Sequence, residues 1–187
     1  GVTFQNGAMF GSMTVTENVR LPLEEFTDLP GEAMDLIARM KLRLVGLDGY
    51  GGYMPSELSG GMLKRAALAR AMVMDPRVLF LDEPSAGLDP ITSAGLDQLI
   101  LRLAASLKIT FVIVSHELPS IFAVADRVIM LDRAARGIVA AGRPDELRER
   151  SDNPRVRQFF NRLADENNGN GSSPARPESV GGEGSHA

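Results

Sequence analysis

The sequence predicts an α/β fold, in which helices alternate with the strands of a parallel sheet. Short apolar runs rich in Val, Ile, Leu and Phe alternate along the chain with longer segments of helical periodicity. The run 78–81 is continuously apolar and ends at the acidic pair Asp82-Glu83, which indicates a strand buried on both faces. A chain of 187 residues is long enough for one domain with a hydrophobic core.

The first part of the chain is expected to hold one strand and two helices. Residues 2–4 are typical of the end of a buried strand, which the turn signal Gln5-Asn6-Gly7 closes. A helix is predicted over 14–23, where a Thr-Glu pair marks its start, and a longer one over about 30–45. In the longer helix, one face of a 3.6-residue period carries the apolar residues Ala33, Ile37, Met40 and Leu44.

The remaining elements alternate in type. Ser59 is expected to cap a helix that continues to about Met74. Strands are predicted at 78–81, 109–114, 127–132 and 138–141. Helices are predicted at 91–107, 117–125, 144–150 and 154–164. Residues 164–187 are rich in Asn, Gly, Ser and Pro, and we expect this tail to be disordered because it offers too little apolar surface to bury.

The composition argues against several classes of function. The net charge is −4, so the chain lacks the basic surface that a nucleic-acid binder needs, and we expect no nucleic-acid partner. There is no cysteine, which excludes disulfides and thiolate metal sites. No apolar run has the length of a membrane span and no signal peptide is visible, so we expect the chain not to cross a membrane by itself.

Polar residues follow three of the predicted strands. Gln5, the pair Asp82-Glu83 and His116 each stand just after an apolar run. Taken singly, such residues are more often a solvated turn or a structural histidine than catalytic groups. Ligands of open α/β sheets bind beyond the carboxyl ends of the strands, however, so the convergence of all three predicts a binding site at that edge.

The segment Ser59-Gly60-Gly61 stands at the start of a predicted helix. By itself it is explained by helix capping. Its second interpretation is anion binding, because glycines let backbone N–H groups approach a phosphate and the helix dipole favours negative charge.

Three segments resemble motifs of the ABC ATPases. The stretch LSGGMLKRAALARAMVMDPRVLFLDEPSAGLDP is similar to their signature motif, Walker B strand and D-loop. VIVSHE resembles their histidine switch, and FQNG their glutamine loop. The resemblance extends over residues 1–163. It implies a RecA-like P-loop NTPase core of the ABC ATPase type, with a helical subdomain at about 13–74.

The resemblance implies a role for each residue at the sheet edge. Asp82 would hold Mg²⁺, and Glu83 would be the general base for the water that attacks the γ-phosphate of ATP. His116 would contact that phosphate and hold the water in line. Gln5 would sense Mg²⁺ and the γ-phosphate and link the site to a membrane partner.

A second set of roles crosses between subunits. Ser59, Gly60 and Gly61 would contact ATP bound to the opposite subunit, and Asp89 would communicate across the same interface. The resemblance therefore implies a homodimer in which each ATP site is built from two protomers.

Two features depart from the family pattern. The signature motif usually ends in Gln, whereas Met62 stands here. The Walker A loop G-x-x-x-x-G-K-[ST] does not occur in these 187 residues. The sequence also begins with Gly rather than Met and enters a strand at once, so we expect an N-terminal segment to be missing. The chain alone is then expected to hydrolyse ATP poorly or not at all.

Among ABC proteins, the pattern favours a transporter ATPase over two alternatives. The first alternative is a soluble ABC protein that acts on DNA or on ribosomes. DNA-acting relatives insert a long coiled coil before the signature and ribosome-acting relatives carry two ATPase domains, and this sequence shows neither feature. The second alternative is a catalytically incompetent regulatory protein. TVTENVRLPL, DNPRVRQFFNRL and Met62 are similar to the ATPases of phospholipid transporters, although an ABC transporter for another substrate stays open.

That resemblance implies an integral membrane permease as partner, with a lipid-binding substrate protein as a further one. It places the chain at the cytoplasmic face of the inner membrane as a peripheral subunit. The segment 153–163 has two interpretations. It either packs on its own domain through Val156, Phe159, Phe160 and Leu163, or it helps to hold the second ATPase subunit.

Overall fold

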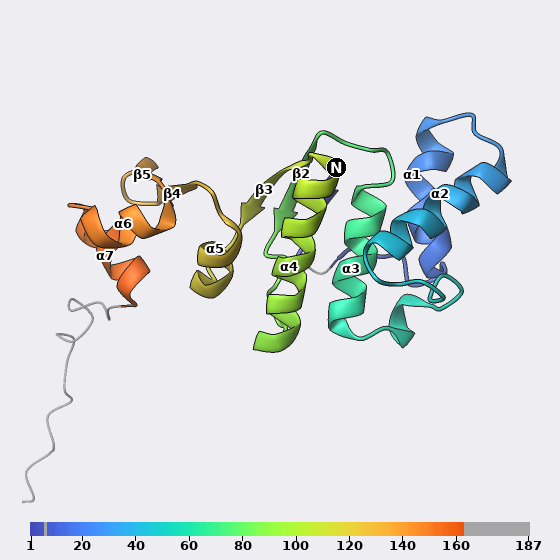
Figure 1. Ribbon diagram of the computed structural model, residues 1–187, viewed down its shortest axis with the longest axis horizontal. Coiled ribbons are helices and arrows are strands. Elements are labelled where there is room, and N and C mark those ends of the chain that lie inside the picture. The colour runs from blue at the N-terminus through green and yellow to red at the C-terminus, as the bar shows by residue number, and fades with distance from the viewer. Residues whose placement is uncertain (6, 163–187) are drawn as a thin grey trace, which may run out of the picture.

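The computed structural model describes residues 1–5 and 7–162, so the tail 164–187, predicted to be disordered, lies outside the described residues. The strands are β1 (Val2–Thr3), β2 (Val78–Asp82), β3 (Thr110–Val114), β4 (Val128–Asp132) and β5 (Gly137–Gly142). The helices are α1 (Val15–Phe26), α2 (Gly31–Leu44), the short 3₁₀ helix η1 (Pro55–Glu57), α3 (Gly60–Ala71), α4 (Pro90–Leu107), α5 (Leu118–Val124), α6 (Pro144–Arg150) and α7 (Pro154–Asn161). Figure 1 shows these elements in a row, from the helices α1 and α2 at one end to α6 and α7 at the other.

The central sheet has the parallel order β1-β2-β3. Val2 pairs with Phe80 across the first ladder, and Asp82 pairs with Val114 across the second. Because the strands run in the same direction, their carboxyl ends lie at one edge of the sheet. This confirms the predicted α/β class and brings the segments after each strand together.

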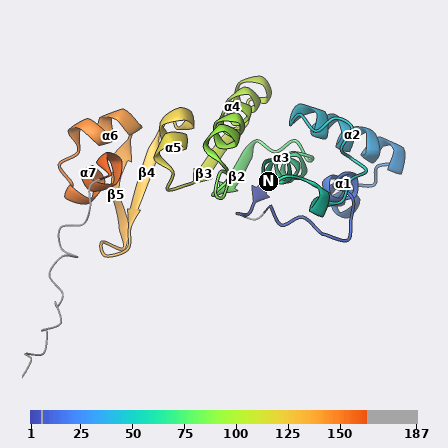
Figure 2. The same cartoon turned by 90° about the horizontal axis from the view of Figure 1, so that it is seen from below.

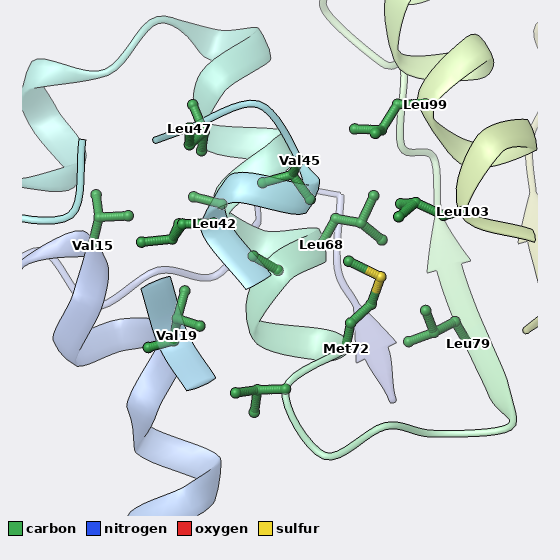
Figure 3. Close-up of a cluster of buried hydrophobic side chains, with 14 of the residues drawn as sticks. Val15, Val19, Leu42, Val45, Leu47, Leu68, Met72, Leu79, Leu99 and Leu103 are labelled. Atoms are coloured by element: carbon green, nitrogen blue, oxygen red, sulfur yellow. The ribbon is translucent and has the colours of Figure 1, made fainter. Parts of the chain in front are cut away.

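One face of the central sheet is covered by helices. Leu79 and Leu81 of β2 are buried in the main hydrophobic cluster. Figure 3 shows Leu79 facing Met72 at the end of α3 and Leu103 of α4. Phe80 points the other way and is 50% exposed. The expectation that this strand is buried on both faces is therefore wrong. The β2 residues on the second face are exposed, so burial alternates along the strand as in a one-sided sheet.

The strands β4 and β5 form a second sheet, which is antiparallel. The prediction of parallel strands is wrong for this pair. Only the loop 133–136 joins the two strands, whereas a parallel connection needs a crossover of a dozen or more residues. The hairpin packs with α5, α6 and α7 around a second hydrophobic cluster, whose buried members are Leu118, Ile121, Leu147, Val156 and Phe160.

Helix α2 buries a face different from the predicted one. Met34, Ala38 and Leu42 are buried against the neighbouring helices, whereas Met40 is 59% exposed and Leu44 is exposed as well. Ala33 and Ile37 lie between these extremes. The helix carries two apolar stripes with the same period, and only its packing against α1 and α3 selects one of them.

Candidate functional site

The carboxyl edge of the central sheet gathers the residues that follow its three strands. Gln5 follows β1, Asp82 ends β2 with Glu83 directly after it, and His116 follows β3. The Nδ1 atom of His116 lies 2.6 Å from Oε1 of Glu83. The backbone N–H of Glu83 donates to the carbonyl oxygen of Val114 at 2.9 Å, which extends the β2–β3 pairing to Glu83 itself. The structure therefore brings Glu83 and His116 into direct contact.

Glu83 has an unusual backbone and an unusual side chain. Its φ of 45° lies in the left-handed region, which is costly for a residue with a Cβ. Its side chain is only 17% exposed, and its Oε2 atom is buried without a hydrogen-bond partner. Strained residues and unpaired buried polar atoms are both concentrated at functional sites.

His116 is more open than its partner. Its side chain is 73% exposed, so most of the imidazole is open to solvent while Nδ1 contacts Glu83. The hydrogen bond to the Glu83 carboxylate, together with its negative charge, raises the pKa of His116. The contact therefore favours the protonated imidazole, which can donate from both nitrogens.

Lys64 of α3 also reaches this edge, and the sequence did not predict it. Its Nζ donates to the carbonyl oxygen of Gln5 and, at 3.2 Å, to that of Glu83. Burial lowers the pKa of Lys64, while the charges of Glu117, Glu83 and Asp82 oppose that change. Nothing in the sequence around Lys64 indicates these contacts, because the two carbonyl groups belong to residues 19 and 59 positions away along the chain.

The signature-like segment lies at the start of α3. Ser59 is the N-cap, and its Oγ accepts a hydrogen bond from the backbone N–H of Met62 at 3.3 Å. Ser59 and Gly60 are exposed, whereas Gly61 is buried. A Cβ added at Gly61 would lie 2.4 Å from Cγ2 of Thr92, so a larger residue at this position would force Thr92 or the two helices to shift.

Asp89 caps the neighbouring helix α4. Its carboxylate accepts from the backbone N–H groups of Ile91 and Thr92 at 3.0 Å each. The hydroxyl and the backbone N–H of Thr92 lower the pKa of Asp89 and keep it ionised. The contact between Gly61 and Thr92 places the starts of α3 and α4 side by side. The predicted site residues thus form two groups, one around Glu83 and one around Ser59 and Asp89.

Asp82 is exposed at the end of β2, next to the residues of the first group. No cluster of three or more His, Asp or Glu side chains suited to a metal ion occurs in the part of the chain that the structure describes. Mg²⁺ is commonly bound through one or two protein oxygens together with substrate phosphates. An exposed carboxylate at the carboxyl edge of a parallel sheet fits that manner of binding. None of the helices over residues 1–5 and 7–162 combines the length and apolar character that a bilayer crossing requires.

Comparison with known families and proteins gives consistent matches. A family model for ABC transporters matches residues 1–86. The intermembrane phospholipid transport system ATP-binding protein MlaF of Escherichia coli K12 is 47% identical over 162 residues, which are 87% of this chain and 59% of the relative. The probable ribonucleotide transport ATP-binding protein mkl of Mycobacterium leprae is 45% identical over 161 residues, which are 86% of this chain and 46% of the relative. The chain spans less than two thirds of the length of either relative.

Two solved structures share the fold. The first is cbiO1 from Clostridium perfringens, part of the ABC transporter complex cbiONQ. Its TM-score is 0.71 at 28% identity, and the match covers 78% of this chain and 57% of that protein. The second is the ATP-binding cassette MJ0796 in a dimeric, post-hydrolysis state with ADP and Pi. Its TM-score is 0.66 at 28% identity, and the match covers 76% of this chain and 62% of that protein.

Proposed function

Because this chain belongs to the ABC transporter ATPase family and shares its P-loop NTPase fold, we propose that it is part of the ATP-binding subunit of a lipid transporter. In this function, hydrolysis of ATP drives transport across the cell envelope. The similarity to the phospholipid transport protein MlaF supports the lipid substrate. The similarity to mkl, named as a probable ribonucleotide transport protein, supports a nucleotide substrate as the second candidate.

The contact between Glu83 and His116 carries the catalytic proposal. His116 engages one carboxylate oxygen, Oε1, and the other oxygen, Oε2, is left without a partner. We assign the Glu83 carboxylate as the base that takes the proton of a water molecule while the water oxygen attacks the γ-phosphorus. Because Oε2 is buried, the side chain has to turn outward before water reaches that oxygen. The bond from the γ-phosphorus to the bridging oxygen breaks, and ADP leaves with that oxygen. The exposed Nε2 side of His116 can donate to a phosphate oxygen.

The remaining residues bind and orient the nucleotide. Asp82 and Gln5 supply oxygen atoms at the sheet edge and would hold Mg²⁺, which neutralises charge on the β- and γ-phosphates when bound. Ser59 and Gly60 are exposed at the start of α3, where the helix dipole favours an anion. We assign them, with Gly61, to ATP held by a second copy of the chain, and Asp89 to the same interface.

The proposed assembly is a homodimer seated on an integral permease at the cytoplasmic face of the inner membrane. The dimeric state of the MJ0796 cassette and the complex that contains cbiO1 support these partners. A lipid-binding substrate protein would be a further partner. The substrate is tested by reconstituting the whole transporter and comparing ATP hydrolysis with phospholipid and with ribonucleotide present. Stimulation by ribonucleotide alone would replace the lipid proposal.

The catalytic proposal is tested with Glu83→Gln in a polypeptide that joins this sequence to a phosphate loop, because these 187 residues contain none. We expect the turnover number to fall by about 10²-fold or more, since the general base is lost while the amide keeps the shape. ATP should still bind, and ATP-bound dimers should accumulate in size-exclusion chromatography.

The matched control is Glu25→Gln, at an exposed position of α1, which should hydrolyse ATP at the unmodified rate. Hydrolysis by Glu83→Gln within a factor of about three of that control would remove Glu83 from the mechanism.

A further inference from the structure

Four polar side chains are buried where α4 and α5 meet. Ser93 and Asp97 lie on α4, Ser120 lies on α5, and Ser85 lies in the turn just after Glu83. Asp97 is 6% exposed and Ser85 only 1%. The catalytic proposal gives none of these four residues a role, although a buried carboxylate is costly unless it is hydrogen-bonded.

The hydroxyl of Ser120 is the centre of this cluster. Its Oγ donates to Oδ2 of Asp97 at 2.9 Å and lies 3.4 Å from Oγ of Ser93 and 3.5 Å from Oγ of Ser85. Ser120 has one proton, and its shortest contact gives that proton to the carboxylate of Asp97. The longer contact to Ser85, in which Ser120 would also be the donor, competes for the same proton, whereas either hydroxyl can donate in the contact with Ser93. Burial raises the pKa of Asp97, and the hydrogen bond from Ser120 opposes that rise.

The cluster lies at the junction of the two hydrophobic clusters. Leu96 and Leu99 of α4 pack in the main cluster with β2, whereas Leu118 and Ile121 of α5 pack in the second one. Figure 2 shows α5 between α4 and the β4–β5 hairpin. Apolar contacts are non-directional, so they fix the position of α5 along α4 less strictly than hydrogen bonds do.

Both members of the catalytic pair are connected to this cluster by short segments. Ser85 stands two residues after Glu83, and Ser120 stands four residues after His116. We propose that Ser120, bound to Asp97, is a positioning residue that fixes α5 against α4 and so holds His116 on the carboxylate of Glu83. The kinetic consequence of this role rests on the proposed ATPase function, whereas the geometric consequence does not.

The geometric consequence is measured on His116 itself. In the complete protein, labelled histidine is titrated by NMR, and the His116 signal is identified by its loss in His116→Gln. The wild-type pKa should be raised, since Glu83 accepts from the imidazole. Ser120→Ala should lower it towards that of a free imidazole, because α5 is no longer held in place.

Three further variants control the result. Ser120→Thr keeps the hydroxyl and should keep the raised pKa. Ser106→Ala removes an exposed hydroxyl from the same helix α4 and should change nothing. Ser120→Cys offers only a weak donor in nearly the same volume, so it should shift the pKa in the same direction if Ser120→Ala does not fold. An unmoved His116 pKa in a folded Ser120→Ala or Ser120→Cys protein would overturn the proposal, as would an unraised pKa in the wild type.

The kinetic consequence separates this proposal from the proposed function. In the polypeptide with a phosphate loop, Ser120→Ala should lower kcat on the order of tenfold while KM for ATP stays within about twofold, because the pair is misplaced but nucleotide contacts remain. A wild type that does not hydrolyse ATP would defeat the proposed function and leave the titration result standing. Full hydrolysis combined with an unmoved pKa would defeat the positioning role alone.

Discussion

At the scale of single residues, the two glycines at the start of α3 meet different surroundings. A Cβ at Gly60 would lie 3.6 Å from Cδ2 of Leu88, which is an ordinary van der Waals contact. A Cβ at Gly61 would lie 2.4 Å from Cγ2 of Thr92, which is closer than packed atoms approach. Space for a side chain is therefore limited at position 61 by the packing of α3 on α4, whereas position 60 has room for a methyl group.

This difference gives a stability prediction. Gly61→Ala should lower the free energy of unfolding by about 1–3 kcal/mol, because the added methyl group pushes α3 away from α4. Gly60→Ala is the matched control and should leave stability within about 0.5 kcal/mol of the wild type. Urea denaturation of both variants measures the difference.

A second substitution tests the cause. Thr92→Ser removes the Cγ2 atom that the new methyl group would meet, so the double variant with Gly61→Ala should recover part of the lost stability. A double variant whose losses simply add would show that the clash lies elsewhere.

At the scale of elements, α2 shows how far periodicity alone can predict packing. The helix was correctly placed by its 3.6-residue pattern, but the pattern fits two stripes, one through Met34 and Ala38 and one through Met40 and Leu44. The choice between them is made by α1 and α3, whose positions a local pattern does not contain. The direction of β5 and the exposure of Phe80 in β2 were predicted wrongly for the same reason. Each depends on which elements pair with or pack against the strand, and a local pattern does not contain that information.

Substitutions of two methionines of α2 test the observed face. Met34→Ala should lower the free energy of unfolding by about 2–5 kcal/mol, because it leaves a cavity in the main hydrophobic cluster. Met40→Ala should change it by less than about 0.5 kcal/mol, since that side chain faces solvent. Denaturant midpoints of the two variants give the comparison, and a larger loss in Met40→Ala would mean that the helix is turned the other way.

The candidate site was predictable where it follows strand order. Gln5, Glu83 and His116 each follow a parallel strand, so the topology alone places them at one edge. The contacts that position them were not predictable, because Lys64 and Asp97 act across long sequence separations and carry no motif of their own. Sequence thus predicted which groups meet, and the structure adds what holds them in place.

At the scale of the whole molecule, the two hydrophobic clusters follow one another along the row of elements in Figure 1. The second cluster contains α5, which follows His116, and it is closed by α7 through Val156 and Phe160. Both side chains are almost fully buried, so the interpretation of this helix as packing on its own domain is confirmed for them. The other predicted members of that face are Phe159, which is half-buried, and Leu163, which lies outside the described residues.

The C-terminal segment was also interpreted as holding the second ATPase subunit. Because α7 is part of the second hydrophobic cluster, a truncation that tests this contact has to leave α7 in place. Removal of residues 152–187 takes away α7 and uncovers Leu118, Ile121 and Leu147, so the free energy of unfolding should fall by at least the roughly 3–5 kcal/mol of one large core deletion. Removal of residues 164–187 keeps α7, Leu163 and every described residue of that cluster, and it should leave stability unchanged. Urea denaturation distinguishes the two truncations, and equal stability would contradict the packing. If the truncation that keeps α7 loses the ATP-bound dimer but not stability, the loss can be assigned to subunit contacts, because the fold around His116 is preserved.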